Sequence, residues 1–208
     1  MAYSKSELYN KICGVLLTDD KPSEFFSSLR NSGQLEEYLP ELAALIGVVQ
    51  PPKYHPEGDA WTHTMLVTDY AASLRESAEY PLGFMFSALF HDLGKPATTK
   101  VYADGAIHSI GHENELGTVR IALTRLTDDE KLIGYVLNMT KLHMRPNILA
   151  SQNSGQKAFF RVFGQSVCPR DLLLLSESDY MGRDGIIEYE SVKAALYERL
   201  EEYEEAHS

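Results

Sequence analysis

The sequence predicts an all-α protein, a helical bundle with one small β-hairpin inserted near residues 100–109. Apolar residues recur at the three- and four-residue spacing of buried helix faces along most of the chain. One segment, KVYADGAIHSI, has short β-prone runs on both sides of an Asp-Gly pair, which is typical of a two-residue hairpin turn because both positions tolerate positive φ. The chain has 208 residues, 44% of them hydrophobic, without a repeat or a concentrated linker, so we expect one domain over residues 1–208.

Five helices are expected in the first half of the chain. The apolar faces of the first three are formed by Leu8, Ile12, Val15 and Leu16, by Phe25, Phe26 and Leu29, and by Leu39, Leu42, Leu45 and Ile46. Gly33 and Gly47 are expected to end the second and third helices. The segment VVQPPKYHPEGD holds three prolines, which exclude a regular helix and predict a loop. The next two helices are expected from Thr62 to about Glu76 and from Leu82 to about Asp92.

The second half is expected to be helical too, apart from the hairpin. One helix is predicted from His112 to Leu126, and the next is opened by Thr127, with Glu130 at the capping-box spacing, and closed by Pro146. Shorter helices follow at about 158–163 and from Pro169, which suits a first helical turn, to about Asp179. The last 21 residues predict an acidic amphipathic helix at about 188–205, with an apolar stripe formed by Val192, Leu196, Leu200 and Tyr203.

The charge of the chain bears on what it binds. Nineteen basic and 30 acidic residues give a net charge of −11, which opposes tight binding to a long nucleic acid. The C-terminal segment supplies −5 of this charge, with seven glutamates against Lys193 and Arg199, so the rest of the chain is closer to neutral. A small phosphorylated ligand is therefore favoured as the partner.

The sequence also predicts where the protein resides. There is no apolar run of the roughly 18 residues that a membrane span needs, and no basic segment followed by an apolar one at the start. We therefore expect a cytoplasmic protein without membrane contact. Cys13 and Cys168 are the only cysteines and are expected to be free, buried thiols. The sequence does not indicate the oligomeric state.

Ionisable residues fall on the apolar faces of the predicted helices. His63, His112, His143 and Asp179 each share the inward stripe of their own helix. A lone inward histidine is usually a hydrogen-bonded core residue, but a buried carboxylate requires a cation or several donors beside it. Four such groups on four helices are difficult to explain by structural roles alone.

A His-Asp pair lies between these helices in the sequence. His91-Asp92-Leu93-Gly94-Lys95 follows an apolar helix face, and Gly94 is expected to end that helix. Imidazole and carboxylate together suit a divalent first-row metal ion. Lys95 brings a positive charge next to the pair. The spacing of this pair relative to His63, His112, His143 and Asp179 predicts a metal site.

This order, H…HD…H…H…D, resembles the HD-domain metal-dependent phosphohydrolases, which have an all-helical fold. A narrower resemblance is to the C-terminal HD domain of bacterial multifunctional CCA-adding enzymes, the tRNA nucleotidyltransferases. The matching segments are FFSSLRNSGQLEEYLPELAALIGV, KYHPEGDAWTHTM, ALFHDLGK, HSIGHENELG, the region around KLHMRP, and LLLSESDYMGR. They cover roughly residues 23–188. No Gly-rich head with paired aspartates is found, so the resemblance implies a free-standing HD domain that does not add CCA.

The resemblance implies a role for each matching residue. It makes His63, His91, Asp92 and Asp179 ligands of a primary metal. His112 and His143 match positions that either hold a second metal or contact the substrate. Lys95 matches a lysine that lies near the phosphate. Pro96 and Ala97 stand where some HD nucleotidases have a glutamate, which disfavours a glutamate-driven mechanism. The cofactor is expected to be one or two divalent ions (Mn, Ni, Co, Fe or Mg).

Other roles follow from the chemistry of such a site. A bound metal lowers the pKa of a water molecule and polarises a phosphoryl oxygen. Asp92 is expected to orient or deprotonate that water, which makes Asp92 and Lys95 the candidate catalytic residues. His108, Arg145 and Arg183 are candidates for binding phosphate oxygens. In the alternative interpretation, Arg145 caps a helix, Arg183 is an exposed loop residue and His108 is solvated.

The expected function is metal-dependent cleavage of a small phosphate ester. The resemblance favours a 2′,3′-cyclic phosphodiester or a nucleotide phosphomonoester. One alternative is a nucleotide or nucleoside-triphosphate phosphohydrolase of the broader HD family. An alternative from another class is a non-catalytic module that binds a nucleotide or a tRNA end; the complete set of ligand residues argues against it.

Overall fold

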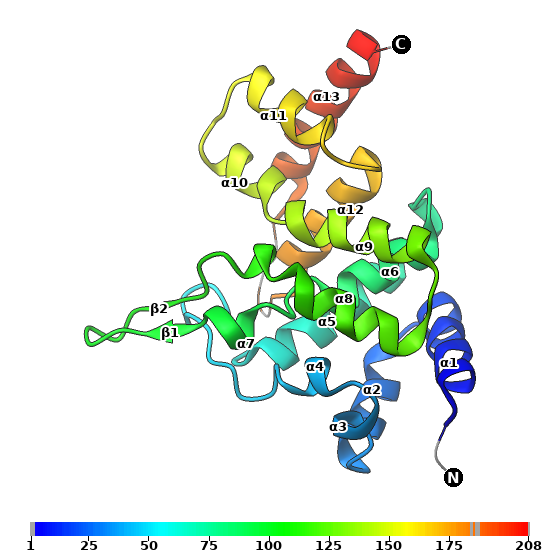
Figure 1. Ribbon diagram of the computed structural model, residues 1–208. Coiled ribbons are helices and arrows are strands. Elements are labelled where there is room, and N and C mark those ends of the chain that lie inside the picture. The colour runs from blue at the N-terminus through cyan, green and yellow to red at the C-terminus, as the bar shows by residue number, and fades with distance from the viewer. Residues whose placement is uncertain (1–2, 184, 186–187, 208) are drawn as a thin grey trace.

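The computed structural model describes residues 3–183, 185 and 188–207, and these residues form helices and one two-stranded sheet (Figure 1). The predicted all-α class with a small hairpin is confirmed. Residues 1–2, 184, 186–187 and 208, which belong to the domain predicted over 1–208, lie outside the described residues. In chain order the elements are α1 (Lys5–Thr18), α2 (Pro22–Asn31), α3 (Leu35–Tyr38), α4 (Pro40–Ala43), α5 (Ala60–Leu74), η1 (Arg75–Ser77), α6 (Pro81–Phe90), α7 (Lys95–Thr98), β1 (Lys100–Val101), β2 (Ile107–His108), η2 (His112–Asn114), α8 (Leu116–Leu126), α9 (Glu130–Leu142), α10 (Arg145–Ser151), α11 (Gln156–Phe163), α12 (Pro169–Met181) and α13 (Glu190–His207).

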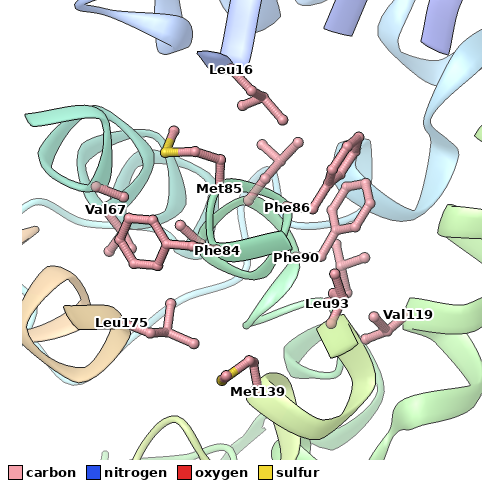
Figure 2. Close-up of a cluster of buried hydrophobic side chains, with 14 of the residues drawn as sticks. Leu16, Val67, Phe84, Met85, Phe86, Phe90, Leu93, Val119, Met139 and Leu175 are labelled. Atoms are coloured by element: carbon pink, nitrogen blue, oxygen red, sulfur yellow. The ribbon is translucent and has the colours of Figure 1, made fainter. Parts of the chain in front are cut away.

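Helix α6 is the centre of the bundle. Its residues from Gly83 to Phe90 are all buried, and α1, α5, α9 and α12 pack around it. Figure 2 shows Phe84, Met85, Phe86 and Phe90 pointing from α6 toward these neighbours. Each fully buried side chain of this size contributes roughly 1.5–3 kcal/mol. The end of α6, where His91 and Asp92 follow, is therefore held firmly from several sides.

The first predicted helices are confirmed with one change. Helix α1 begins with a capping box, in which the Ser4 side chain and the Glu7 backbone and side chain bond reciprocally. The third predicted helix, over residues 39–46, is instead the short helix α4 followed by turns, and a separate short helix, α3, precedes it. Pro40 takes the first turn of α4, because it has no N–H group to continue the preceding turn.

Three predicted boundaries in the second half are wrong. The helix expected from His112 is a 3₁₀ turn, η2, followed by α8. Thr127 does not cap α9; Asp129 does, and its carboxylate accepts from the N–H groups of Lys131 and Leu132. Pro146 does not close α9, which ends at Leu142, but lies in the first turn of α10, a helix that the sequence analysis did not predict. Proline suits that position because no N–H is needed there.

The hairpin is confirmed, but its predicted two-residue turn is wrong. Lys100 pairs with His108 and Val101 with Ile107, and the Tyr102 N–H donates to the Ala106 carbonyl, so the loop is longer. Gly105 has a φ of 82°, whereas Asp104 is not among the non-glycine residues with positive φ. In Figure 1 the hairpin extends away from the helices.

The remaining predictions about the fold concern the two cysteines, the C-terminal helix and membrane-spanning segments. Cys13 and Cys168 are free, as predicted, but only Cys168 is buried; Cys13 is partly exposed, which corrects the expectation of two buried thiols. The acidic C-terminal helix is present as α13, which packs on α10, α11 and α12 through residues that include Leu196 and Leu200. One hydrophobic cluster runs from Leu8 to Leu200 among the described residues. No helix in the described part of the chain is long and apolar enough to cross a membrane.

Candidate metal centre

Three elements bring four predicted ligands together in the interior. His63 lies in the first turns of α5, His91 and Asp92 directly follow α6, and Asp179 lies near the end of α12. His63 and His91 are 0% exposed, Asp92 is 1% exposed and Asp179 is 7% exposed. The start of α5 is fixed by Asp59, whose carboxylate accepts from the Thr62 N–H at 2.9 Å. These burial values mean that the two carboxylates depend on partners within the protein or on a cation.

The four side chains are within a few ångströms of one another. His63 Nε2 lies 3.0 Å from Asp179 Oδ1 and 3.8 Å from Asp92 Oδ2. His91 Nε2 lies 3.2 Å from Asp92 Oδ2 and 3.8 Å from Asp179 Oδ1. The Nε2 atoms of His63 and His91 thus each face the carboxylates of both Asp92 and Asp179. The potential metal ligand groups in the described residues include His63, His91 and Asp179 as one set and His91, Asp92 and His143 as another.

His112 and His143 join the same cluster from its other side. His112 lies in η2 and its Nε2 is 3.1 Å from Asp92 Oδ1. His143 is the C-cap residue of α9. The centroid of its ring lies 5.1 Å from that of the His91 ring and 5.4 Å from that of the His112 ring. The structure therefore brings all six predicted metal-site residues into one buried cluster.

Backbone carbonyls fix the orientation of three of these histidines. His91, His112 and His143 each donate from Nδ1 to the carbonyl three residues earlier, at 2.8, 2.8 and 2.6 Å. A carbonyl oxygen can only accept, so Nδ1 carries the proton and the lone pair of Nε2 is free to bind a metal. Each Nε2 is therefore available as a ligand atom within the cluster.

Several atoms of the cluster lack hydrogen-bond partners. His91 Nε2, His112 Nε2 and Asp92 Oδ2 are buried and make no hydrogen bond in the described structure, although Lys95 lies close to Asp92. A different buried carboxylate, Asp171, accepts from the Glu79 and Tyr80 N–H groups and from the Tyr135 hydroxyl. Buried polar atoms are normally satisfied, as they are at Asp171. The residues of the cluster thus fit a divalent cation.

The charges of the cluster determine its protonation. Burial by itself would raise the pKa of Asp92, but His91 and Lys95 outweigh it and hold that pKa well below its ordinary value. The same balance, with His63 and Arg183 as the partners, keeps the pKa of Asp179 low. Burial and the neighbouring His91 lower the pKa of His143 to about 3. Both carboxylates are ionised and His143 is neutral at pH 7, which are the forms that bind metals.

The cluster forms one end of a pocket of about 560 Å³. The pocket is lined by Gln50, Pro51, Tyr54, His55, Asp92, Lys95, residues 106–113, His143, Met144, Asp179 and Arg183. Of the predicted substrate-binding residues, His108 and Arg183 therefore face the pocket. Arg145 does not line it, because His143 and Met144 turn toward the pocket while Arg145 starts α10 on the other side of that junction.

Lys95 is directly connected to the cluster. Its Nζ lies 2.5 Å from Asp92 Oδ2 and donates to Gln50 Oε1 at 2.5 Å. The side chain is 8% exposed, on the pocket wall. Lys95 begins α7 directly after Gly94. The structure thus places a buried cation beside the Asp92 carboxylate on the pocket wall.

The sequence analysis missed Glu57, His55 and Gln50. Glu57 Oε1 lies 2.8 Å from His55 Nδ1 and 2.9 Å from His63 Nδ1, and its side chain is 1% exposed. His55, Glu57 and His63 form a further potential metal-binding group. The available signal was the acidic and histidine residues of HPEGD immediately before the helix of His63. A loop has no periodicity to show which side chains turn inward.

Fold and site together define the class of this protein. A helical bundle with one small hairpin that gathers histidines and aspartates in the order H…HD…D is HD-domain-like. No protein-family model matches the chain.

Its sequence relatives are multifunctional CCA proteins. The chain is 36% identical over 177 residues, 82% of its length, to the multifunctional CCA protein of Burkholderia cenocepacia. It is 33% identical over 186 residues, 85% of its length, to that of Actinobacillus pleuropneumoniae. The predicted resemblance is confirmed. The chain spans 41% and 44% of the lengths of these two relatives.

Proposed function

We propose that the protein is a metal-dependent phosphohydrolase that cleaves a small phosphate ester. The observation that carries this proposal is the buried cluster of His63, His91, Asp92 and Asp179, in which imidazole and carboxylate atoms converge and some lack hydrogen-bond partners. The cluster opens on a pocket of a size usual for small ligands, about 300–1,000 Å³.

The proposed primary ligands are His63, His91, Asp92 and Asp179. His112 and His143 lie within the same cluster, so they either hold a second ion or contact the substrate. When bound, a divalent ion would supply an acidified water molecule and neutralise charge on a phosphoryl oxygen. Nitrogen and oxygen ligands suit Mn, Fe, Co, Ni or Mg.

The protein's own residues have separable tasks in this proposal. The low pKa of Asp92 keeps it ionised, so it would orient an attacking water rather than store its proton. Lys95, on the pocket wall beside Asp92, would bind a phosphate oxygen, and Arg183 and His108 line the same pocket. These donors are already positioned before the substrate arrives, which lowers the cost of stabilising developing negative charge.

The pocket supports a nucleotide as the substrate. Tyr54, Ile107, Ile110 and Met144 give it apolar surface next to the cationic end, which suits a base or sugar attached to a phosphate. The resemblance to CCA-type HD domains favours a 2′,3′-cyclic phosphodiester or a nucleotide phosphomonoester, and the CCA relatives favour the end of a tRNA as a possible source of such a group. The two free thiols suit a reducing compartment, and we propose that the protein acts in the cytoplasm.

The proposal is tested by metal content and substrate turnover measured together. The purified protein is analysed for bound metals, and 2′,3′-cyclic AMP, nucleoside monophosphates and nucleoside triphosphates are each offered with Mn²⁺, Ni²⁺, Co²⁺, Fe²⁺ or Mg²⁺. We expect cyclic or monophosphate turnover in the wild type and none in Asp92→Ala. Turnover of triphosphates alone would support the broader HD activity instead. A folded protein that binds none of these metals would overturn the proposal.

A further inference from the structure

A second, smaller hollow lies behind the metal pocket. Its volume is about 310 Å³, and it is lined by Glu113, Asn114, Lys141, Leu142, Arg145, Leu149, Ala158, Arg161, Val162 and Gln165. Glu113 lines both cavities. At the junction of α9 and α10, His143 and Met144 face the metal pocket, and Leu142 and Arg145 face the hollow. The two cavities thus share Glu113 of η2 as a lining residue, and the α9–α10 junction contributes side chains to both. We call the smaller one the rear pocket.

Three cations line the rear pocket. Lys141 comes from the last turn of α9, Arg145 from the start of α10 and Arg161 from the last turn of α11. All three side chains are exposed, and Figure 1 shows α10 and α11 in the upper part of the molecule, after α9 in the chain. Among the described lining residues, Glu113 is the one acid.

These cations differ from several others in the protein, which are paired with acids. Arg120, Arg125, Arg170 and Arg199 each form an ion pair with a glutamate. In the described residues, neither Lys141, Arg145 nor Arg161 has an ion pair or a side-chain hydrogen bond. Unpaired cations gathered in one hollow of a chain with a net charge of −11 form a local positive field that the total charge conceals.

The shape and chemistry of the rear pocket suit a phosphate. Two guanidinium groups and an ammonium provide donors that match phosphate oxygens, and the Asn114 and Gln165 amides also line the hollow. Buried Leu142, Leu149 and Val162 form an apolar floor, against which a sugar or base could rest. An open surface patch would lack this enclosure.

We propose that the rear pocket binds a second phosphate of the substrate, the phosphodiester that precedes the reacting group at the end of a single-stranded oligoribonucleotide. The proposal rests on the proposed function for the position of the reacting group. It extends the proposed substrate from a mononucleotide to the end of an oligoribonucleotide. A contact to one phosphate is compatible with the overall negative charge, whereas a long nucleic-acid track is not.

The kinetic test compares substrates that differ in this phosphate. 2′,3′-Cyclic AMP and a triadenylate with the same cyclic end are hydrolysed by the wild type and by Lys141→Glu/Arg161→Glu. The control is Lys131→Glu/Lys157→Glu, which places the same charge change on the same two helices but outside the rear pocket. We expect the wild type and the control to prefer the trinucleotide in kcat/KM by tenfold or more. The rear-pocket variant should lose that preference. Equal preferences in the wild type and this variant would overturn the proposal.

A binding measurement separates this proposal from the proposed function. A fluorescein-labelled triadenylate with a free 3′-hydroxyl is titrated with each protein, followed by anisotropy at several salt concentrations. We expect affinity to fall tenfold or more in Lys141→Glu/Arg161→Glu, and the salt slope to fall by about 0.7 for one lost phosphate contact. If triadenylate binding depends on Lys141 and Arg161 but no substrate is hydrolysed, the rear-pocket proposal stands and the proposed hydrolase function is refuted. Hydrolysis without such binding, or an effect on inorganic phosphate alone, would refute the rear-pocket proposal.

Discussion

Glu57 Oε1 lies 2.9 Å from Nδ1 of His63, and Nε2 of the same ring faces Asp179 at 3.0 Å. His63 differs in this from His91, His112 and His143, whose Nδ1 atoms contact neutral carbonyls. A carboxylate behind a metal-binding histidine orients the ring and increases its basicity as a ligand. Glu57 thus links the proline-rich loop to the proposed metal centre.

The first prediction concerns this pair. Glu57→Gln should weaken metal binding by about 10–100-fold, the usual effect of losing such an outer partner. The measurement is the dissociation constant for Mn²⁺ or Ni²⁺, determined by competition with a chelator. Glu41→Gln, which removes a remote carboxylate paired with Arg125, is the control and should bind metal as the wild type does. An unchanged constant in Glu57→Gln would show that His63 does not need this carboxylate.

The second prediction distinguishes two buried aspartates. Added metal should raise the melting temperature of the wild type, since a ligand that binds only the folded state stabilises it. Asp179→Asn should abolish this rise. Asp171→Asn should keep it but lower the free energy of unfolding by about 1.5–3 kcal/mol, because Asp171 accepts from Glu79, Tyr80 and Tyr135. Thermal unfolding with and without metal measures the first effect, and urea unfolding measures the second. A metal-induced rise in Asp179→Asn would remove that residue from the ligand set.

The third prediction concerns Lys95. Lys95→Met removes the cation beside Asp92 and should lower kcat by about 10²–10³-fold, the loss typical of one positioned donor. Metal should still bind, because the imidazole and carboxylate atoms remain. Steady-state kinetics at saturating metal, with metal content measured in parallel, tests this. Lys100→Met, on the exposed strand β1, is the matched control. If Lys95→Met turns over at the wild-type rate, Lys95 is a structural partner of Asp92 and Gln50.

The fourth prediction concerns the backbone next to the His-Asp pair. A Cβ atom at Gly94 would lie 2.1 Å from the carbonyl oxygen of His112. Gly94→Ala should therefore displace η2 and, with it, the His112 imidazole, and should reduce both stability and metal-dependent activity. Gly134→Ala is the control, since nothing lies within 4 Å of its new Cβ, and it should stabilise α9 by up to about 1 kcal/mol. Thermal unfolding and turnover of the two variants are compared. Wild-type behaviour of Gly94→Ala would mean that this close contact is not needed.

Much of the site was predictable because its residues occupy periodic positions. His63, Asp179 and the pair after α6 come from helices whose apolar spacing shows which face is inward. His112 was predicted on a helix and lies in a 3₁₀ turn, but it is still buried at 5% exposure. Arg145 was predicted near the phosphate and instead lines the rear pocket, because α9 ends at Leu142 and a separate helix starts at residue 145. Whether each predicted site residue acts as proposed stays a prediction.

The sequence by itself determined the helical class, the hairpin and the set of histidines and aspartates that face inward. These features depend on local spacing and on the cost of burying charge, which are both readable along one chain. The tertiary structure decided which partners these residues meet. It set Lys95 against Asp92, placed Glu57 behind His63 and separated the rear pocket from the metal pocket. These relationships join residues from different elements, and their geometry depends on how helices pack around α6, which no local pattern encodes.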